Sequence, residues 1–444
     1  MSDTQQASAP SASAAAMAAS ETISTELSNI IVDPLSYQTP GVLDEAFATI
    51  RRDTPFAKAK PDDYDHFWVV SRHADVLEIE KRADVFQNSP RSSTISPQTT
   101  EGVVRFLTGG ESNLIRSLVA VDGAEHKALR GIVFPAMTPQ NIRKLEDGVR
   151  AIARTYVDQM LALDGTCDFA EDIAFYYPLR VIMQVLGVPE EDEPYLLKLT
   201  QELFGASDPE MNRNKKVATP EEALQQLVQT NADLEAYFEE VTKKFRAEPD
   251  PTKVNSMIAN ATIDGEYLTH RQIMGYYIIA ATAGHDTTSN TTAGALWALA
   301  ERPELLARLQ ADPSLIGAFT EESIRWVTPV KHFMRTAVVD TEFNGHQIKA
   351  GEWLMLPYHS ANRDEAAFDA PSEFSIDRKP NRHVAFGYGP HVCVGQHLAR
   401  MEMRVLWEEL LPRIATLELT GTPELTRSNF VCGPKHVPIR WTLK

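Results

Sequence analysis

The sequence contains little cysteine: Cys167, Cys393 and Cys432 are the only three in 444 residues. Three cysteines cannot form the disulfide framework of a small secreted protein, and so few are typical of a reducing compartment. We therefore expect a cytoplasmic protein. A lone cysteine is more often a small buried apolar residue than a ligand, so a functional role for any of the three needs further evidence.

The chain also lacks long apolar runs and an excess of basic residues. No uninterrupted apolar segment is long enough to cross a bilayer, so no membrane partner is expected. The formal net charge of −18 argues against nucleic acid, which demands a basic surface. The 43% hydrophobic and 23% charged residues that are present are typical of a soluble globular protein with a sizeable core.

Hydrophobic periodicity predicts a mainly α fold with small β-sheets. Residues 1–25 are rich in Ala, Ser and Thr and are expected to form a disordered tail, followed by a single domain over residues 26–444. The segments 88–112 and 207–220 lack a period and are expected to be loops. Helices are expected over residues 41–52, 74–82, 138–192, 221–247, 313–326 and 394–411, and strands over 67–70 and within 336–356.

Residues 268–302 predict one long helix, with Thr269 as its N-cap and Pro303 after its end. Its flanks are apolar on nearly every side, which places it in the middle of a large domain. Its centre nevertheless reads Ala-Gly-His-Asp-Thr-Thr over residues 283–288. Such a polar insert is costly in a core unless it is hydrogen-bonded or functional.

The most specific pattern surrounds Cys393, in Phe386-Gly-Tyr-Gly-Pro-His-Val-Cys393-Val-Gly395. Gly387 and Gly389 permit tight turns and the close approach of a flat ligand. Cys393 stands just before a predicted helix, where free N–H groups favour a thiolate. The residue types alone leave two interpretations open, a thiolate ligand or a buried structural cysteine in a glycine-rich turn.

As an ordered string, this segment resembles the haem-binding loop of the cytochrome P450 mono-oxygenases. The resemblance implies the single large triangular fold of that family and haem b (iron protoporphyrin IX) as the cofactor. It makes Cys393 the metal ligand and places Phe386 and Gly395 against the cofactor. It also implies four cationic partners for the haem propionates: His126, Arg130, Arg335 and His391.

Two further segments extend the resemblance. Asp286 and Thr287 match the acid and alcohol that deliver protons to bound dioxygen, which requires a relay in a largely dry pocket. Thr287 has a simpler interpretation as well, a hydroxyl bonded to the helix carbonyl one turn earlier. Glu322 and Arg325, with Arg378, resemble the ion-pair lock behind the haem loop and are expected to be structural. His285 is expected to be a core histidine paired with a neighbour.

By resemblance, the protein hydroxylates a small apolar substrate with dioxygen. The substrate residues are expected to be apolar or small: Ile279, Thr282, Ala283, Val330 and Val431. Similarity to the bacterial branch that includes α-terpineol hydroxylase favours a monoterpene alcohol or an aromatic hydrocarbon. A peroxide-driven peroxygenase of the same fold and a haem-based sensor are the alternatives.

Electrons are expected from a separate ferredoxin and its reductase, because the haem domain occupies the whole chain. Such a ferredoxin is acidic, so the resemblance predicts a basic docking patch, with Lys127, Arg130 and Arg400 as candidates. The protein is expected to be a monomer.

Overall fold

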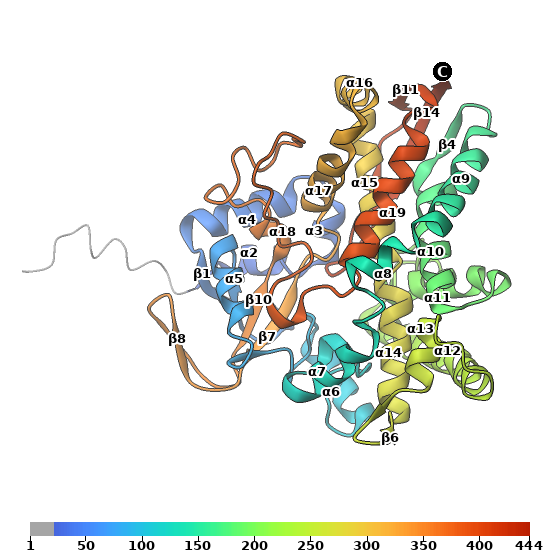
Figure 1. The fold of residues 1–444 in the computed structure, drawn as a ribbon. Coiled ribbons are helices and arrows are strands. Elements are labelled where there is room, and N and C mark those ends of the chain that lie inside the picture. Colours follow the sequence, from blue (N-terminus) through green and yellow to red (C-terminus); the bar gives the residue numbers. More distant parts are fainter. Residues whose placement is uncertain (1–21) are drawn as a thin grey trace, which may run out of the picture.

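The computed structural model describes residues 22–444 (Figure 1). Most of the expected tail, residues 1–21, lies outside the described residues. Its last part does not behave as a tail: the Ile23 N–H donates to the Lys58 carbonyl at 2.9 Å, and a helix begins at Thr25. The folded chain therefore starts a few residues before position 26.

Helices make up most of the structure. In chain order they are α2 (Thr25–Ile30), α3 (Pro34–Gln38), α4 (Val42–Asp53), α5 (His73–Lys81), α6 (Gln98–Thr108), α7 (Gly123–Val133), α8 (Pro139–Arg143), α9 (Glu146–Leu161), α10 (Tyr177–Leu186), α11 (Glu193–Phe204), α12 (Pro220–Ala247), α13 (Val254–Ala259), α14 (His270–Ala283), α15 (Asp286–Ala300), α16 (Pro303–Ala311), α17 (Ile316–Val327), α18 (Tyr358–Ala361) and α19 (Gln396–Leu410). Five short helical turns accompany them: η1 (Leu118–Ala120), η2 (Ala170–Ala174), η3 (Glu190–Asp192), η4 (Pro313–Leu315) and η5 (Gly389–His391).

The strands form a five-stranded sheet and smaller ones. The largest has the order β1-β2-β10-β7-β3, from Phe56–Ala59, Phe67–Val70, Trp353–Leu356, Phe333–Ala337 and Phe86–Gln87. Strand β10 runs parallel to β2 and antiparallel to β7, which places Leu354 opposite Arg335. A second sheet has the order β11-β14-β4, from Ile414–Leu419, Pro438–Leu443 and Thr166–Asp168. The remaining strands pair as hairpins: β5 (Thr262–Ile263) with β6 (Glu266–Tyr267), β8 (Thr341–Phe343) with β9 (His346–Ile348), and β12 (Glu424–Leu425) with β13 (Pro434–His436).

Most of the expected elements are confirmed, and three segments differ. Residues 88–112 are not a loop throughout, because they contain α6, which buries Val104 and ends at Gly109 in the left-handed conformation. The many Ser, Thr and Gly residues around it obscure the helical pattern of this short amphipathic helix in the sequence. The helical pattern over residues 138–192 is interrupted by β4, which joins a sheet with a strand from the far end of the chain.

The predicted long helix over residues 268–302 is two helices. The capping box at Thr269 is present, and α14 ends at Ala283. After a gap of two residues α15 begins at Asp286, and most of it is buried, in agreement with the expected central position. Gly284 at the break lies against α10: an added Cβ would stand 2.6 Å from the Ile182 side chain. The close approach of α10 therefore requires a glycine at the break between the two helices.

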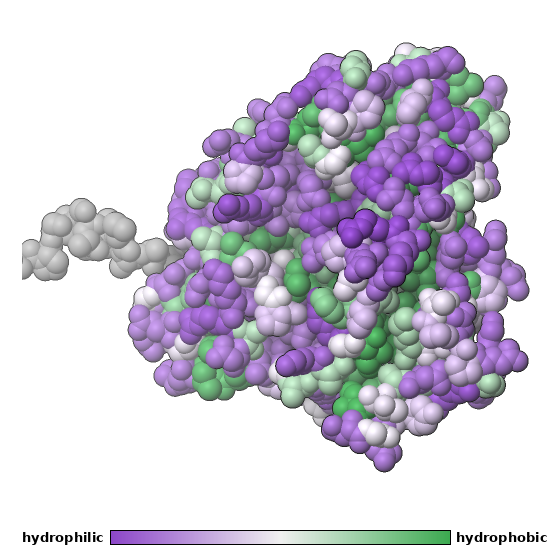
Figure 2. Space-filling view, in the orientation of Figure 1, coloured by the Kyte–Doolittle hydropathy of each residue, from purple (hydrophilic) through white to green (hydrophobic). Residues whose placement is uncertain are grey.

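Helices and sheet occupy different sides of the molecule (Figure 1). The five-stranded sheet lies with the N-terminal helices, whereas α9, α10, α14, α15 and α19 gather on the opposite side. The face shown in Figure 2 is mostly hydrophilic, as the net charge leads one to expect. Among residues 22–444, no helix is both long and apolar enough to cross a bilayer.

Candidate active site

A cavity of about 510 Å³ lies between the Cys393 segment and the break between α14 and α15. Thirteen of the residues predicted for cofactor, substrate or proton delivery line it: His126, Arg130, Ile279, Thr282, Ala283, Thr287, Val330, Arg335, Phe386, His391, Cys393, Gly395 and Val431. They come from positions up to 305 residues apart, which a linear motif alone could not bring together. Asp286 is not among the lining residues.

The Cys393 segment is a compact turn that ends at the start of α19. The Cys393 N–H donates to the Phe386 carbonyl at 2.9 Å, which closes the turn. Gly387 and Gly389 have φ of 68° and 69°, and a side chain at Gly389 would stand 2.4 Å from the Glu80 carbonyl oxygen. Both the backbone conformation and the close approach therefore require glycine at position 389.

The sulfur of Cys393 is exposed to the cavity. Burial within the protein raises the pKa of the Cys393 thiol, while the N–H groups of Gly395 and Gln396 and the charges of Arg130 and Arg400 act in the opposite direction. Thiolate-favouring groups thus converge on this sulfur. Neither Cys167 nor Cys432 lines the cavity.

Two basic side chains face the cavity without a carboxylate partner among the described residues. Arg130 donates from Nη2 to the Val392 carbonyl at 2.7 Å. His126 is buried and its ring lies 4.0 Å from that of His391, centroid to centroid. Burial, with the charges of His391 and Arg130, lowers the pKa of His126 to about 4. An anion placed in the cavity would relieve this unfavourable environment.

The other two predicted cations already have acidic partners. Arg335 donates to Glu80 Oε1 at 2.9 Å, and both side chains are buried. His391 Nε2 lies 3.1 Å from Asp122 Oδ1. These carboxylates were not predicted from the sequence, because they lie on α5 and just before α7, far from the residues that they contact.

Thr287 is the second residue of α15, beside the helix break. Its hydroxyl donates to the Ala283 carbonyl at 3.0 Å, which is the local hydrogen bond expected from the sequence. Ala283 is exposed although it lies in the centre of the fold, because it faces the cavity. The local bond and a polar notch open to the cavity therefore coexist at Thr287.

Asp286 and His285 lie beside this notch but do not line the cavity. Asp286 Oδ1 lies 3.5 Å from His285 Nδ1, and Asp286 Oδ2 is buried with no hydrogen-bond partner among the described residues. His285 is fully buried and contacts α11 and the segment before α10. This is the paired core histidine that the sequence predicts.

The rest of the cavity wall is mostly apolar. Val330 and Val431, which are 101 positions apart, form an antiparallel bridge at its edge. Phe333 and Phe430 add ring surface with centroids 5.4 Å apart. Neither phenylalanine was predicted, since nothing in the local sequence marks it.

One buried carboxyl group in the wall was also missed. Glu402 on α19 lines the cavity and is 1% exposed, and its Oε2 has no hydrogen-bond partner in the described part of the chain. Burial raises the pKa of Glu402 well above its usual value, opposed by a hydrogen bond with Thr288. Its position in the second turn of an amphipathic helix resembles that of an ordinary surface glutamate.

Glu322, Arg325 and Arg378 meet away from the cavity. Glu322 and Arg325 are completely buried and joined by two hydrogen bonds of 2.7 and 2.8 Å. Arg378 adds an ion pair of 3.3 Å to the same carboxylate. Arg325 also donates to the carbonyl groups of Asn362 and Pro371, so the cluster fastens α17 to the segment that leads to the Cys393 turn.

Of the three cations suggested for a docking patch, Lys127 alone is an exposed residue. Arg130 is held at the cavity, as described above. Arg400 is paired with Glu321 at 2.6 Å and lies over the Phe386 ring. Arg143 and Lys144 at the end of α8 are exposed instead, and α8 packs on α19, the helix that follows Cys393.

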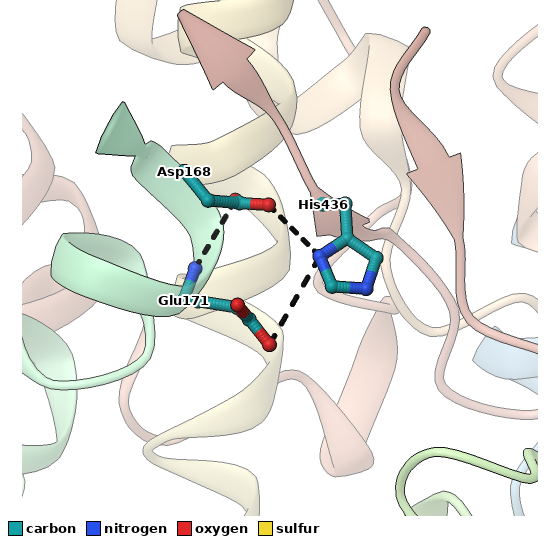
Figure 3. A group of neighbouring side chains, drawn as sticks. All are labelled: Asp168, Glu171 and His436. Carbon is teal, nitrogen blue, oxygen red and sulfur yellow. Dashed lines mark hydrogen bonds and ion pairs between the residues drawn. The ribbon is translucent and has the colours of Figure 1, made fainter. Parts of the chain in front are cut away.

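A second cluster of titratable groups lies outside the cavity (Figure 3). Ligand-type atoms of Asp168, Glu171 and His436 lie within 4.8 Å of one another. His436 Nδ1 is 2.8 Å from Asp168, and its Nε2 is 2.7 Å from Glu210. Because both ring nitrogens already face carboxylates, the cluster is an ion-pair network that joins β13 to the loop before α12.

Comparison with known proteins agrees with this geometry. Residues 101–437 match the family model for cytochrome P450. The chain is 44% identical over 430 residues to cytochrome P450-terp of a Pseudomonas species, covering 96% of this chain and all of the relative. The crystal structure of CYP108D1 from Novosphingobium aromaticivorans is 42% identical and has a TM-score of 0.87, over 95% of this chain and all of that one. A Mycobacterium marinum cytochrome P450, CYP268A2, solved with pseudoionone, is 29% identical with a TM-score of 0.83, over 92% and 97% of the two chains.

Proposed function

Because the chain belongs to the cytochrome P450 family, whose members are haem-dependent mono-oxygenases, we propose that it hydroxylates a monoterpene alcohol or a small aromatic hydrocarbon. The observation that carries the proposal is the placement of Cys393 and Thr287 on one largely apolar cavity. An apolar pocket with few polar groups selects small hydrophobic molecules. The similarity to P450-terp and to a P450 that binds pseudoionone supports a substrate of terpene size.

The residues present fit a haem group. Cys393 supplies a thiolate ligand, and Arg130 and His126, which lack carboxylate partners among the described residues, supply donors for propionates. Arg335 and His391 add to these donors from the same cavity. We propose the non-covalent form, haem b, because Cys393 is the sole cysteine on the cavity wall and covalent attachment would require others.

In the proposed reaction the protein's own residues bind the haem iron, hold a hydroxyl at the cavity, supply a carboxylate and shape the substrate pocket. When bound, the haem iron supplies the chemistry that activates dioxygen, with Cys393 as its electron-donating ligand. Thr287 holds a hydroxyl at the cavity, and Asp286 beside it provides a carboxylate that exchanges protons with that hydroxyl through water. Ile279, Val330 and Val431 exclude bulk water and orient the substrate.

Electrons come, in this proposal, from a ferredoxin and its reductase. The residues that support it are the exposed Lys127 on α7 and the exposed Arg143 and Lys144 at the end of α8, a helix that packs on α19.

A titration with terpenes and arenes tests the substrate class. Binding of a suitable molecule displaces water from the ferric iron, and the Soret band shifts to shorter wavelength. We expect monoterpene alcohols or small arenes to cause this shift and to give hydroxylated products when electrons are supplied. A panel in which none of these molecules shifts the band would refute the proposed substrate class.

A further inference from the structure

His285 lies next to the proposed proton-delivery pair, Asp286 and Thr287. Its ring contacts both Asp286 and a helix that lines the cavity. It occupies the break between α14 and α15, and its side chain is fully buried. A histidine buried in this way must find partners for both ring nitrogens. Those partners come from three different parts of the fold.

Each ring nitrogen faces groups that accept hydrogen. Nε2 lies 2.7 Å from the Phe175 carbonyl oxygen, which can only accept. Nδ1 lies 3.3 Å from Thr200 Oγ1 and 3.5 Å from Asp286 Oδ1. The Thr200 hydroxyl donates its one hydrogen to the Leu197 carbonyl at 3.0 Å, so toward His285 it acts as an acceptor.

Asp286 has few other contacts that could fix it. Its Oδ2 is buried and unpartnered within residues 22–444, so the Nδ1 contact is what orients the carboxylate. Thr200 belongs to α11, and the end of the same helix supplies Leu203 and Phe204 to the cavity wall. His285 therefore connects the carboxylate to a helix that lines the cavity.

We propose that His285 is a positioning residue that holds Asp286 through Nδ1 and links its orientation to α11. The inference rests on the proposed function, since it assigns His285 a role through the Asp286–Thr287 relay. It does not make His285 a member of the relay: among the described residues His285 does not line the cavity.

Two substitutions separate the two nitrogens. In His285→Asn the amide nitrogen takes the place of Nδ1, and in His285→Gln that of Nε2. The measurements are product and hydrogen peroxide formed per electron, the solvent deuterium isotope effect on turnover, and substrate affinity from the Soret shift. We expect His285→Gln to lower product per electron on the order of tenfold, as loss of an outer-sphere partner typically does, with a changed isotope effect. His285→Asn should recover most of the coupling, and substrate affinity should differ little between the two.

Thr200→Val and Asp286→Asn complete the experiment. Thr200→Val preserves shape and removes the acceptor on α11, and we expect it to uncouple turnover in the same direction as His285→Gln. If His285→Gln fails to fold, Thr200→Val alone decides the link to α11. Equal uncoupling in the Asn and Gln variants, or full coupling in His285→Gln beside an uncoupled Asp286→Asn, would overturn the inference while leaving the relay intact. Full coupling in Asp286→Asn would overturn the relay itself, and the inference with it.

Discussion

Arg335 and Glu80 form a buried ion pair at the edge of the cavity, with a guanidinium nitrogen 2.9 Å from a carboxylate oxygen. Tyr358 donates a second hydrogen bond of 2.6 Å to the same oxygen, whereas Glu80 Oε2 has no partner among the described residues. Burial raises the pKa of Glu80, and Arg335 and Tyr358 oppose that effect. Arg335 thus favours the charged form of a carboxylate whose burial disfavours it.

Arg335→Met is therefore expected to cost more stability than its size suggests. Removing one partner of a buried pair leaves an uncompensated charge and typically costs about 3–5 kcal/mol. Adding Glu80→Gln to this variant removes that charge, so the double variant should unfold at a higher temperature than Arg335→Met. Thermal unfolding of the single and double variants measures the difference. A double variant less stable than Arg335→Met would show that the pair does not behave as a charge pair.

Cys393→Ser tests the ligand assignment. A serine hydroxyl does not provide the thiolate that shifts the Soret band of the reduced carbon monoxide complex to long wavelength. We expect that red-shifted band to disappear in Cys393→Ser and to persist in Cys167→Ser, a control whose side chain does not line the cavity. A red-shifted band in the Cys393 variant would rule out this sulfur as the ligand.

The sequence predicts the cavity residues well where they follow a linear pattern. Cys393 with Gly387 and Gly395, and the basic residues one helical turn apart at His126 and Arg130, all line the cavity as the local sequence predicts. What the sequence does not reveal is set by distant contacts. Glu80 and Glu402 look like surface carboxylates until packing buries them, and the helix break at Gly284 is fixed by Ile182, about a hundred positions earlier.

Thr287→Ala tests the hydroxyl at the helix break. The substitution removes the bond to the Ala283 carbonyl and the polar group at the cavity, so protons should arrive less efficiently and electrons should be diverted to hydrogen peroxide. We expect product per electron to fall severalfold or more, while Thr287→Ser retains most of it because the hydroxyl is kept. The assay is product and peroxide per electron consumed. Equal coupling in the Ala and Ser variants would show that the hydroxyl is dispensable.

His436 gives the protein a pH-dependent contribution to stability. Burial acts to lower the pKa of His436, but its hydrogen bonds with Glu210 and Asp168 and the nearby charge of Glu171 outweigh it, so the pKa lies above its usual value of 6.5. Lys435 forms ion pairs with Asp208 and with Glu210, the latter also a partner of His436. A histidine whose pKa is raised by folding stabilises the protein fully below pH 6.5 and loses that effect as the pH rises through the folded-state value.

The stability lost in His436→Gln should accordingly be largest near pH 6 and shrink toward pH 9. Chemical unfolding across this range, compared with the exposed-residue variant His270→Gln, gives the measurement. A stability difference that stays constant with pH would show that His436 does not change its charge there.

The exposed basic residues Lys127 on α7 and Arg143 and Lys144 at the end of α8 lead to a prediction about the rate of reduction. Lys127, Arg143 and Lys144 are exposed basic residues on a protein of net charge −18, and an acidic ferredoxin can be attracted to such positions. Replacing all three by Gln should slow reduction by the ferredoxin at low salt on the order of tenfold, because long-range attraction governs the rate of encounter. Substrate affinity should stay unchanged, since none of the three lines the cavity.

A matched triple variant distinguishes this patch from total charge. Gln at the exposed residues Lys60, Lys198 and Lys243 changes the net charge by the same amount at other positions. We expect that control to be reduced at nearly the native rate, and both rates to converge as salt screens the attraction over about 10 Å at 0.1 M. Equal slowing in the two triple variants would mean that net charge, and not this surface, controls the encounter, because a local docking site depends on where the charges are.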